Sequence, residues 1–295
     1  MAKTLWIILL CVLGLSIRAF TQSELVPNHT PCAESKASSR EVPIQVYRGY
    51  LAVVEGSIGN MQNLRFLIDT GASPSIIDER IANALGSVQT PARLALATRT
   101  LSVKQSTVPT MCVGTLRANS VPVLTQDLST VSTSLGLQID GIIGLDVLSQ
   151  SSFTIDYKSR RLRFGPIQDS TVGVPFETGP PFVTVRVLLQ DKTRRLLVDT
   201  GASAAMLFQT HIGDIAPLQR LDTNSAANLG GQFQRIKVAF KDMQLGETKL
   251  GPQIGFIVED QRDSGRDFDG VLGIAALQFY EVGFDFEHQK LIWRH

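Results

Sequence analysis

The chain has 295 residues and a mass of 32.2 kDa, with 43% hydrophobic residues, 19% charged residues and a formal net charge of +1. This length allows one large domain or two ordinary ones, and the apolar content is enough for a sizeable core, which excludes a mainly disordered chain. There is no basic excess of the kind that favours nucleic acid, and three cysteines are too few for a small disulfide-stapled scaffold.

The N-terminus has the pattern of a secretory signal peptide. Lys3 precedes an apolar run from Leu5 to Leu15, and the small residue Ala19 follows. We therefore expect residues 1–19 to act as a signal peptide that is cleaved after Ala19 or after Ser23, and the mature protein to be secreted or periplasmic. The apolar run is short for a membrane span of about 20 residues, and an uncleaved membrane anchor is the alternative interpretation.

Residues 20–41 are polar and contain two prolines, which predicts a mobile lead-in without a core of its own. The mature chain keeps two cysteines, Cys32 in this lead-in and Cys112 further along. They are able to pair in an oxidising compartment, but the sequence leaves open whether they meet.

After the lead-in, three blocks of sequence recur in one order, which indicates an internal duplication. FLIDTGAS at 66–73 returns as LLVDTGAS at 196–203, and DGIIG at 140–144 returns as DGVLG at 269–273. IDY ahead of RLRF returns as FDF ahead of KLIW, and all offsets are 129 or 130. The repeat predicts two homologous halves of ordinary domain size, 42–166 and 172–295, related by a pseudo-twofold axis.

Within each half, most local signals favour β-strands. In chain order we expect strands at 50–54 and 65–68, short helices at 78–85 and 128–135, a hairpin turn at 156–161, strands at 182–187 and 195–198, and a hairpin turn at 285–290. The helices are few and short. The predicted class is therefore all-β, with two β-barrel lobes and minor helices.

The residues with the strongest chemical signal are Asp69 and Asp199, each at the end of an apolar strand and followed by Thr-Gly. A single turn of this kind is often only a structural cap, since Asp and Gly favour turns. Two identical turns in a tandem repeat are a stronger signal, because a pseudo-twofold axis would bring the two carboxyl groups together. Such a pair shares a proton, so that one member acts as a base and the other as an acid.

These motifs resemble the aspartic-protease superfamily and, in particular, its retropepsin-like branch. The alanine after each Asp-Thr-Gly, Ala72 and Ala202, is similar to the retroviral-type enzymes and unlike the pepsin-like ones. The resemblance covers nearly the whole mature chain. It implies two fused retropepsin-like lobes in one chain and a likeness to aspartic endopeptidases, which hydrolyse peptide bonds through a water held between two aspartates.

The resemblance also implies roles for the neighbouring residues. Thr70 and Thr200 would bond across the interface between the halves, and Gly71 and Gly201 would supply backbone N–H groups to the carboxylates. Neither a metal nor another cofactor is implied. The implied partner is a peptide or protein substrate, with no nucleic acid, and with a membrane only if the N-terminal segment stays uncleaved. The molecule is expected to be a monomer with an intramolecular pair of aspartates.

Enzymes of this type cover their substrate with hairpin flaps, and by position the candidates are 94–101 and 228–234. The first candidate tip carries Ala97 and Thr98, and the second carries Gly230 and Gly231, a pair that allows a flexible turn. A different class of function is also open: a non-catalytic peptide-binding or scaffold protein would keep the fold. The two intact Asp-Thr-Gly turns argue against this alternative, because a binder needs neither acid.

Overall fold

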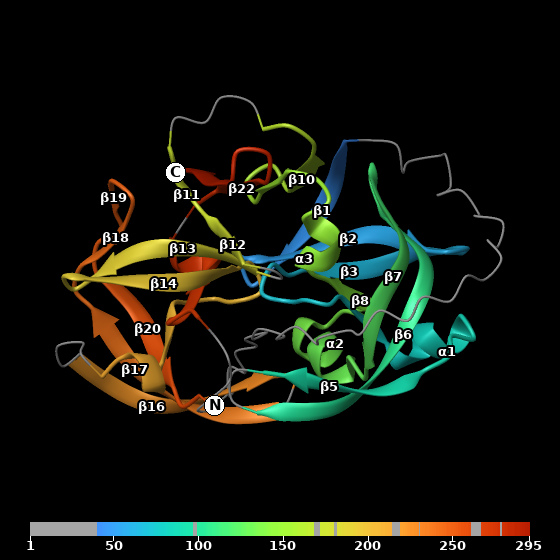
Figure 1. The fold of residues 1–295 in the computed structure, drawn as a ribbon, viewed down its shortest axis with the longest axis horizontal. Coiled ribbons are helices and arrows are strands. Elements are labelled where there is room, and N and C mark those ends of the chain that lie inside the picture. The colour runs from blue at the N-terminus through green and yellow to red at the C-terminus, as the bar shows by residue number, and fades with distance from the viewer. Residues whose placement is uncertain are drawn as a thin grey trace.

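The fold is described from a computed structural model that covers residues 40–96, 99–167, 172–179, 182–213, 219–229, 231–260, 267–277 and 279–295. Strands dominate it, which confirms the all-β class (Figure 1). The signal peptide and nearly all of the lead-in lie outside the described residues. No helix among the described residues is long and apolar enough to cross a membrane.

The described residues of the first half form ten strands and three short helices. They are β1 (Glu41–Tyr47), β2 (Leu51–Ile58), β3 (Met61–Ile68), β4 (Ile76–Asp78), α1 (Glu79–Ala84), β5 (Thr90–Ala95), β6 (Thr100–Val113), β7 (Leu116–Gln126), α2 (Ser129–Leu135), β8 (Gly141–Ile143), α3 (Leu145–Leu148), β9 (Phe153–Asp156) and β10 (Arg161–Phe164). The Asp78 carboxylate accepts a hydrogen bond from the Arg80 backbone N–H and caps α1, and Gly136 ends α2 in a left-handed conformation. Both predicted helices and the hairpin turn at 156–161 are confirmed.

The second half has the same character. Its elements are β11 (Gly173–Pro175), β12 (Glu177–Gly179), β13 (Phe182–Leu189), β14 (Lys192–Asp199), β15 (Met206–Phe208), the 3₁₀ helix η1 (Gln209–His211), β16 (Gln219–Asn228), β17 (Gly231–Phe240), β18 (Met243–Leu245), β19 (Thr248–Lys249), β20 (Gln253–Val258), β21 (Gly270–Gly273), the 3₁₀ helix η2 (Ile274–Leu277), β22 (Glu281–Asp285) and β23 (Lys290–Arg294). The strands expected at 182–187 and 195–198 and the hairpin turn at 285–290 are confirmed.

The strands that lead into the two turns lie in the same local arrangement. β3 pairs in parallel with β8, with Phe66 opposite Gly141, and β14 pairs in parallel with β21, with Leu196 opposite Gly270. Each is also paired on its other edge, β3 with β2 and β14 with β13. A strand flanked on both edges and packed on both faces has an apolar sequence, as these two strands do toward their ends.

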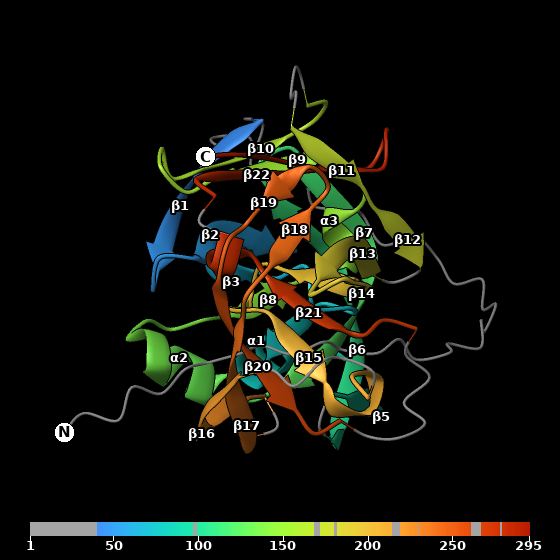
Figure 2. The same ribbon diagram turned by 90° about the vertical axis from the view of Figure 1, so that its left-hand side faces the viewer.

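The two halves contribute strands to one shared sheet. Its strand order where they meet is β11-β23-β22-β9-β10-β1, so three strands of the second half lie next to three strands of the first, and the two groups join through the antiparallel pair β22–β9. The Phe153 and Phe284 rings stack across the β9–β22 pair with centroids 4.8 Å apart. These strands lie at the top of Figure 1, and the two sets of remaining strands extend below them on either side. Figure 2 shows the shared strands from the side, above β8 and β21. The shared sheet therefore fixes how the halves are placed.

Candidate active site

The two Asp-Thr-Gly turns face each other where the halves meet. In this part of the fold Asp69 and Asp199 are 1% and 0% exposed. Thr70 Oγ1 donates to the Val198 carbonyl at 2.8 Å and accepts from the Thr200 N–H at 3.0 Å. In return, Thr200 Oγ1 donates to the Ile68 carbonyl at 3.0 Å and accepts from the Thr70 N–H at 3.1 Å. Four buried bonds thus tie the turns together.

The glycine of each turn lies close to both carboxyl groups. Its N–H donates to the carboxylate of its own turn, and its Cα faces the carboxyl group of the opposite turn. The Gly71 N–H donates to Asp69 Oδ1 at 2.8 Å, and the Gly201 N–H donates to Asp199 Oδ1 at 2.7 Å. A Cβ atom on Gly71 would lie 2.5 Å from the Asp199 carboxyl carbon, and one on Gly201 would lie 2.8 Å from Asp69 Oδ2. Only glycine therefore fits at these two positions, because any side chain would collide with the facing carboxyl group.

The electrostatics of the pair follow from its burial. Desolvation raises the pKa of Asp69 to about 7, although hydrogen bonds from the Asp199 carboxyl group and the Gly71 N–H lower it. Desolvation also raises the pKa of Asp199 well above its usual range, and the charge of Asp69 raises it further. Asp199 Oδ2 is buried and has no hydrogen-bond partner within the described residues. Two coupled carboxyl groups with raised pKa values hold one proton between them near neutral pH.

The crossing strands behind the turns explain two further glycines. A Cβ atom on Gly144 would lie 2.3 Å from the Ala72 carbonyl oxygen, and one on Gly273 would lie 2.6 Å from the Ala204 nitrogen. The chain after β8 and the end of β21 therefore press directly against the backbone of the two turns. These glycines build the site by close packing and carry no reactive group.

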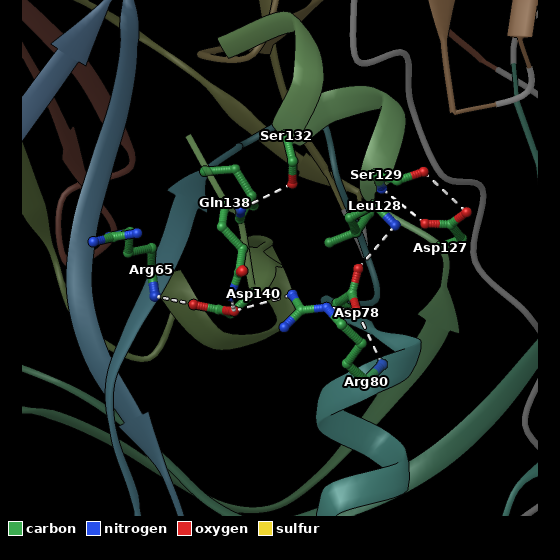
Figure 3. A network of polar contacts seen from close by, with 10 residues as sticks. Arg65, Asp78, Arg80, Asp127, Leu128, Ser129, Ser132, Gln138 and Asp140 are labelled. Carbon is green, nitrogen blue, oxygen red and sulfur yellow. Dashed lines mark hydrogen bonds and ion pairs between the residues drawn. The ribbon is translucent and has the colours of Figure 1, made fainter. Parts of the chain in front are cut away.

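The aspartates of the DGIIG and DGVLG blocks hold the backbone. Asp140 Oδ2 accepts from the Arg65 N–H at 2.9 Å, and Asp269 Oδ2 accepts from the Arg195 N–H at 2.9 Å. Figure 3 shows Asp140 between Arg65 and the side chain of Arg80, whose guanidinium lies 3.2 Å from Asp140 Oδ1. These bonds fasten β3 and β14 just ahead of the turns, which is a structural role.

A hairpin is present at each of the two positions predicted for flaps. β5 and β6 pair with Leu94 opposite Leu101, and β16 and β17 pair with Asn228 opposite Gly231. Ala97, Thr98 and Gly230 lie outside the described residues, so their predicted role stays a prediction. Gly231 has a φ of +99°, a conformation that favours glycine.

The two hairpins also meet each other. Arg99 Nη2 donates to the Gln232 carbonyl oxygen at 2.9 Å, which joins the first hairpin to the second near their tips. In Figure 1 the ends of β5 and β16 approach each other at the bottom of the molecule, away from the shared sheet. The described parts of the two hairpins thus come together at this end of the molecule. We call the hairpin β5–β6 the first flap and the hairpin β16–β17 the second flap.

Sequence reasoning missed two tyrosines near Asp199 and an arginine whose charge acts on one of them. Tyr50 is 3% exposed, its hydroxyl bonds Ser203 in the second turn, and burial raises its pKa to about 12. Tyr157 has a buried hydroxyl, and the charge of Asp199 adds to the effect of burial in raising its pKa. Arg235 is a buried cation on the second flap. None of the three lies in a repeated Asp-Thr-Gly turn, so the only sequence feature that could have pointed to them is the apolar character of their neighbours.

Within the described residues, no group of three or more His, Cys, Asp or Glu side chains is placed to hold a metal ion. Cys112 is disulfide-bonded, and Cys32, whose pairing with it the sequence left open, lies outside the described residues. No curated protein matches the chain significantly. The family model described as aspartyl protease matches residues 54–147, a range that includes the first Asp-Thr-Gly turn. The first half of the chain therefore contains an aspartyl-protease-like domain.

Proposed function

We propose that this protein is an aspartic endopeptidase that hydrolyses peptide bonds with Asp69 and Asp199 as its catalytic pair. The observation that carries the proposal is the reciprocal bonding of Thr70 and Thr200, which holds two identical turns face to face inside one chain. The family match supports the proposal for the first half, and the repeated motif supports the same role for the second.

In the proposed mechanism, a water molecule lies between the two carboxyl groups. The ionised carboxylate takes a proton from the water while the water oxygen attacks the peptide carbonyl carbon. The protonated member donates a hydrogen bond to the carbonyl oxygen as negative charge develops there, and a proton then passes to the leaving nitrogen. Burial of Asp69 and Asp199 favours the state with one shared proton, which supplies the base and the acid at the same pH.

The remaining features of the proposal follow from the chain order. Two fused retropepsin-like lobes, about 42–166 and 172–295, would provide one aspartate each, so a monomer suffices. The flaps would open to admit a peptide or protein substrate and close over it. We also propose that residues 1–19 direct the protein out of the cytoplasm, as a secreted or periplasmic enzyme, or as a membrane-anchored one if the segment is not cleaved.

The test is to incubate purified mature protein with a mixed peptide library, with and without a statine-type inhibitor, which mimics the tetrahedral intermediate. We expect internal cleavage that the inhibitor blocks. Binding of peptides without cleavage, under conditions where the inhibitor also binds, would instead indicate a non-catalytic peptide-binding protein. Cleavage that the inhibitor leaves unchanged would exclude the proposed catalytic pair.

A further inference from the structure

The largest fully buried side chain in the described part of the molecule is that of Arg235, which is 2% exposed. It projects from β17 on the second flap, and its guanidinium lies 3.5 Å from the centroid of the Phe256 ring. Burial lowers the pKa of Arg235 to about 10, so the group still carries its positive charge at neutral pH. Burying a cation costs free energy of folding. A buried positive charge on a hairpin of the proposed substrate site therefore suggests a functional role.

Arg235 is linked to the second Asp-Thr-Gly turn through Phe256, whose backbone N–H donates to the Ala205 carbonyl just after that turn at 2.9 Å. The charges of Arg235 and Asp199 both act on the phenol of Tyr50, whose hydroxyl bonds Ser203, four residues after Asp199. Tyr50 comes from the first half, and Arg235 and Ser203 come from the second. The three residues thus gather at the seam between the halves, beside the candidate catalytic pair. A substrate side chain held between the second flap and the second turn would meet them there.

The guanidinium is also presented in a way that suits a carboxylate. Its face stacks on Phe256, and its N–H donors lie along the edge, in the plane of the group. A planar edge of this kind matches the two oxygens of a carboxylate, with two parallel charge-assisted hydrogen bonds. An amide of the same shape would form weaker bonds, because it carries no charge.

The first flap differs at the matching position, and sheet register identifies that position. In the second half, Lys237 pairs with Phe256, and Phe256 pairs with Met206. In the first half, Gln105 pairs with Leu124, and Leu124 pairs with Ile76. Met206 and Ile76 are 130 residues apart, the offset of the repeat, so Lys237 and Gln105 are equivalent.

Arg235 on β17 and Val103 on β6 each lie two residues closer to the hairpin tip than these equivalent positions. Val103 is buried in an apolar cluster with Leu124, so the first flap offers no charge where the second has a cation.

We propose that Arg235, with Tyr50 and Ser203, forms a subsite that selects an acidic side chain of the substrate on one side of the scissile bond. This inference rests on the proposed endopeptidase function. The opposite subsite, bordered by Val103, takes an apolar side chain. The enzyme therefore prefers peptides with Asp or Glu on one side of the cleaved bond and an apolar residue at the matching distance on the other.

The test uses peptide pairs that differ only by Glu or Gln at one position, placed in turn at each of the positions flanking a cleaved bond. We expect kcat/KM to favour Glu by at least about tenfold at one position, the size expected of a charge-assisted hydrogen bond. Arg235→Leu should bring that ratio close to one. Arg235→Lys should keep part of it, because the charge remains while the planar fork is lost. Arg117→Gln removes an exposed cation and should leave the ratio unchanged.

A second readout separates this inference from the proposed function. Uncleavable reduced-amide versions of the same peptide pairs should bind wild-type protein with the same Glu preference, and thermal unfolding checks that each variant is folded. A wild-type enzyme that cleaves peptides with a Glu-to-Gln ratio within twofold at every position overturns the inference alone. So does a folded Arg235→Leu variant that retains the preference. A wild-type protein that neither cleaves the peptides nor binds their reduced-amide forms overturns the proposed function and the inference with it.

Discussion

In the first half, a serine and a half-buried aspartate tie the turn that carries Asp69 to the chain behind it. The Ser75 hydroxyl donates to Asp146 Oδ1 at 2.8 Å and accepts from the Gly144 N–H at 2.9 Å, and the Ser75 N–H donates to Asp146 Oδ2 at 3.0 Å. The turn that carries Asp199 has alanines at both matching positions, Ala205 and Ala275. Its support is therefore apolar packing.

This difference lies entirely behind the turns. On the side where the turns meet, both halves have the same Asp, Thr and Gly, with nearly the same hydrogen-bond lengths. The comparison teaches that a pair of carboxyl groups sharing a proton places the same demands on both halves. Each carboxyl group needs a glycine N–H as hydrogen-bond donor and a glycine small enough to let the opposite carboxyl group come close. The supporting contacts only have to keep the turn in place, and polar or apolar contacts can do so.

The largest expected effect tests whether the two aspartates are equivalent. Asp69→Asn and Asp199→Asn should each lower kcat/KM by roughly 10²–10⁴-fold or more, because each removes either the acid or the base. Circular dichroism and thermal unfolding should show a retained fold, since Asn has nearly the same shape. If one variant keeps near-wild-type turnover as a monomer, the intramolecular pair is wrong.

The next effect tests the reciprocal threonine bonds. Thr70→Val and Thr200→Val should each destabilise the protein by about 2 kcal/mol or more, because each leaves a buried N–H and a buried carbonyl without a partner. Thr70→Ser and Thr200→Ser keep the hydroxyl and should cost clearly less. Denaturant unfolding measures these free energies. A large cost in one half with none in the other would break the equivalence of the two turns.

The pH dependence should follow the raised pKa values of the pair. Activity requires one shared proton. The pKa of Asp69 is raised to about 7 by burial, and burial together with the charge of Asp69 raises the pKa of Asp199, so the pair reaches its one-proton state as pH rises through about 7. The bell-shaped profile should therefore rise through about pH 7 and have its optimum near or above neutral pH. Replacing both alanines, Ala72→Ser with Ala202→Ser, adds hydroxyls able to bond the charged carboxylates and should shift the profile toward acid. An optimum as acidic as that of a gastric enzyme would show that other contacts set the pKa values.

Linkage gives a companion expectation for stability. A carboxyl group whose folded pKa is raised contributes stability that is fully present below its unfolded pKa near 4 and is lost as pH rises through its folded pKa. The melting temperature should therefore fall as pH rises from about 4 through about 7. Asp69→Asn should weaken this dependence, because it removes one of the two coupled groups. An unchanged dependence in that variant would assign the effect to other carboxylates.

The smallest effect sharpens the difference between the halves. Asp146→Ala should destabilise the protein by about 1–3 kcal/mol, because the Ser75 N–H loses its acceptor. Adding Ser75→Ala recreates the arrangement of the second half and should cost little more, so the two changes should not be additive. Fully additive free energies in denaturant unfolding would show that Ser75 and Asp146 do not act as a unit.

Much of this site could be predicted from the sequence, because its elements are local or repeated. The strand–turn pattern identifies Asp69 and Asp199 as chain neighbours of Thr and Gly, and the offset of 130 marks them as equivalent. Tyr50 and Arg235 could not be found in this way. Tyr50 comes from one half and approaches a turn of the other, and Arg235 resembles any charged residue on a flap strand.

By itself the sequence determined the all-β class, the strands that precede each turn and the residues of the two turns, because hydrophobic pattern and turn chemistry act over a few residues. Only the tertiary structure decided how the halves join, since the pairing of β9 with β22 in one sheet links segments that are far apart in the chain. It also decided that Arg235 is a buried cation stacked on Phe256. Burial depends on which surfaces meet, and that information is shared among residues far apart in the chain.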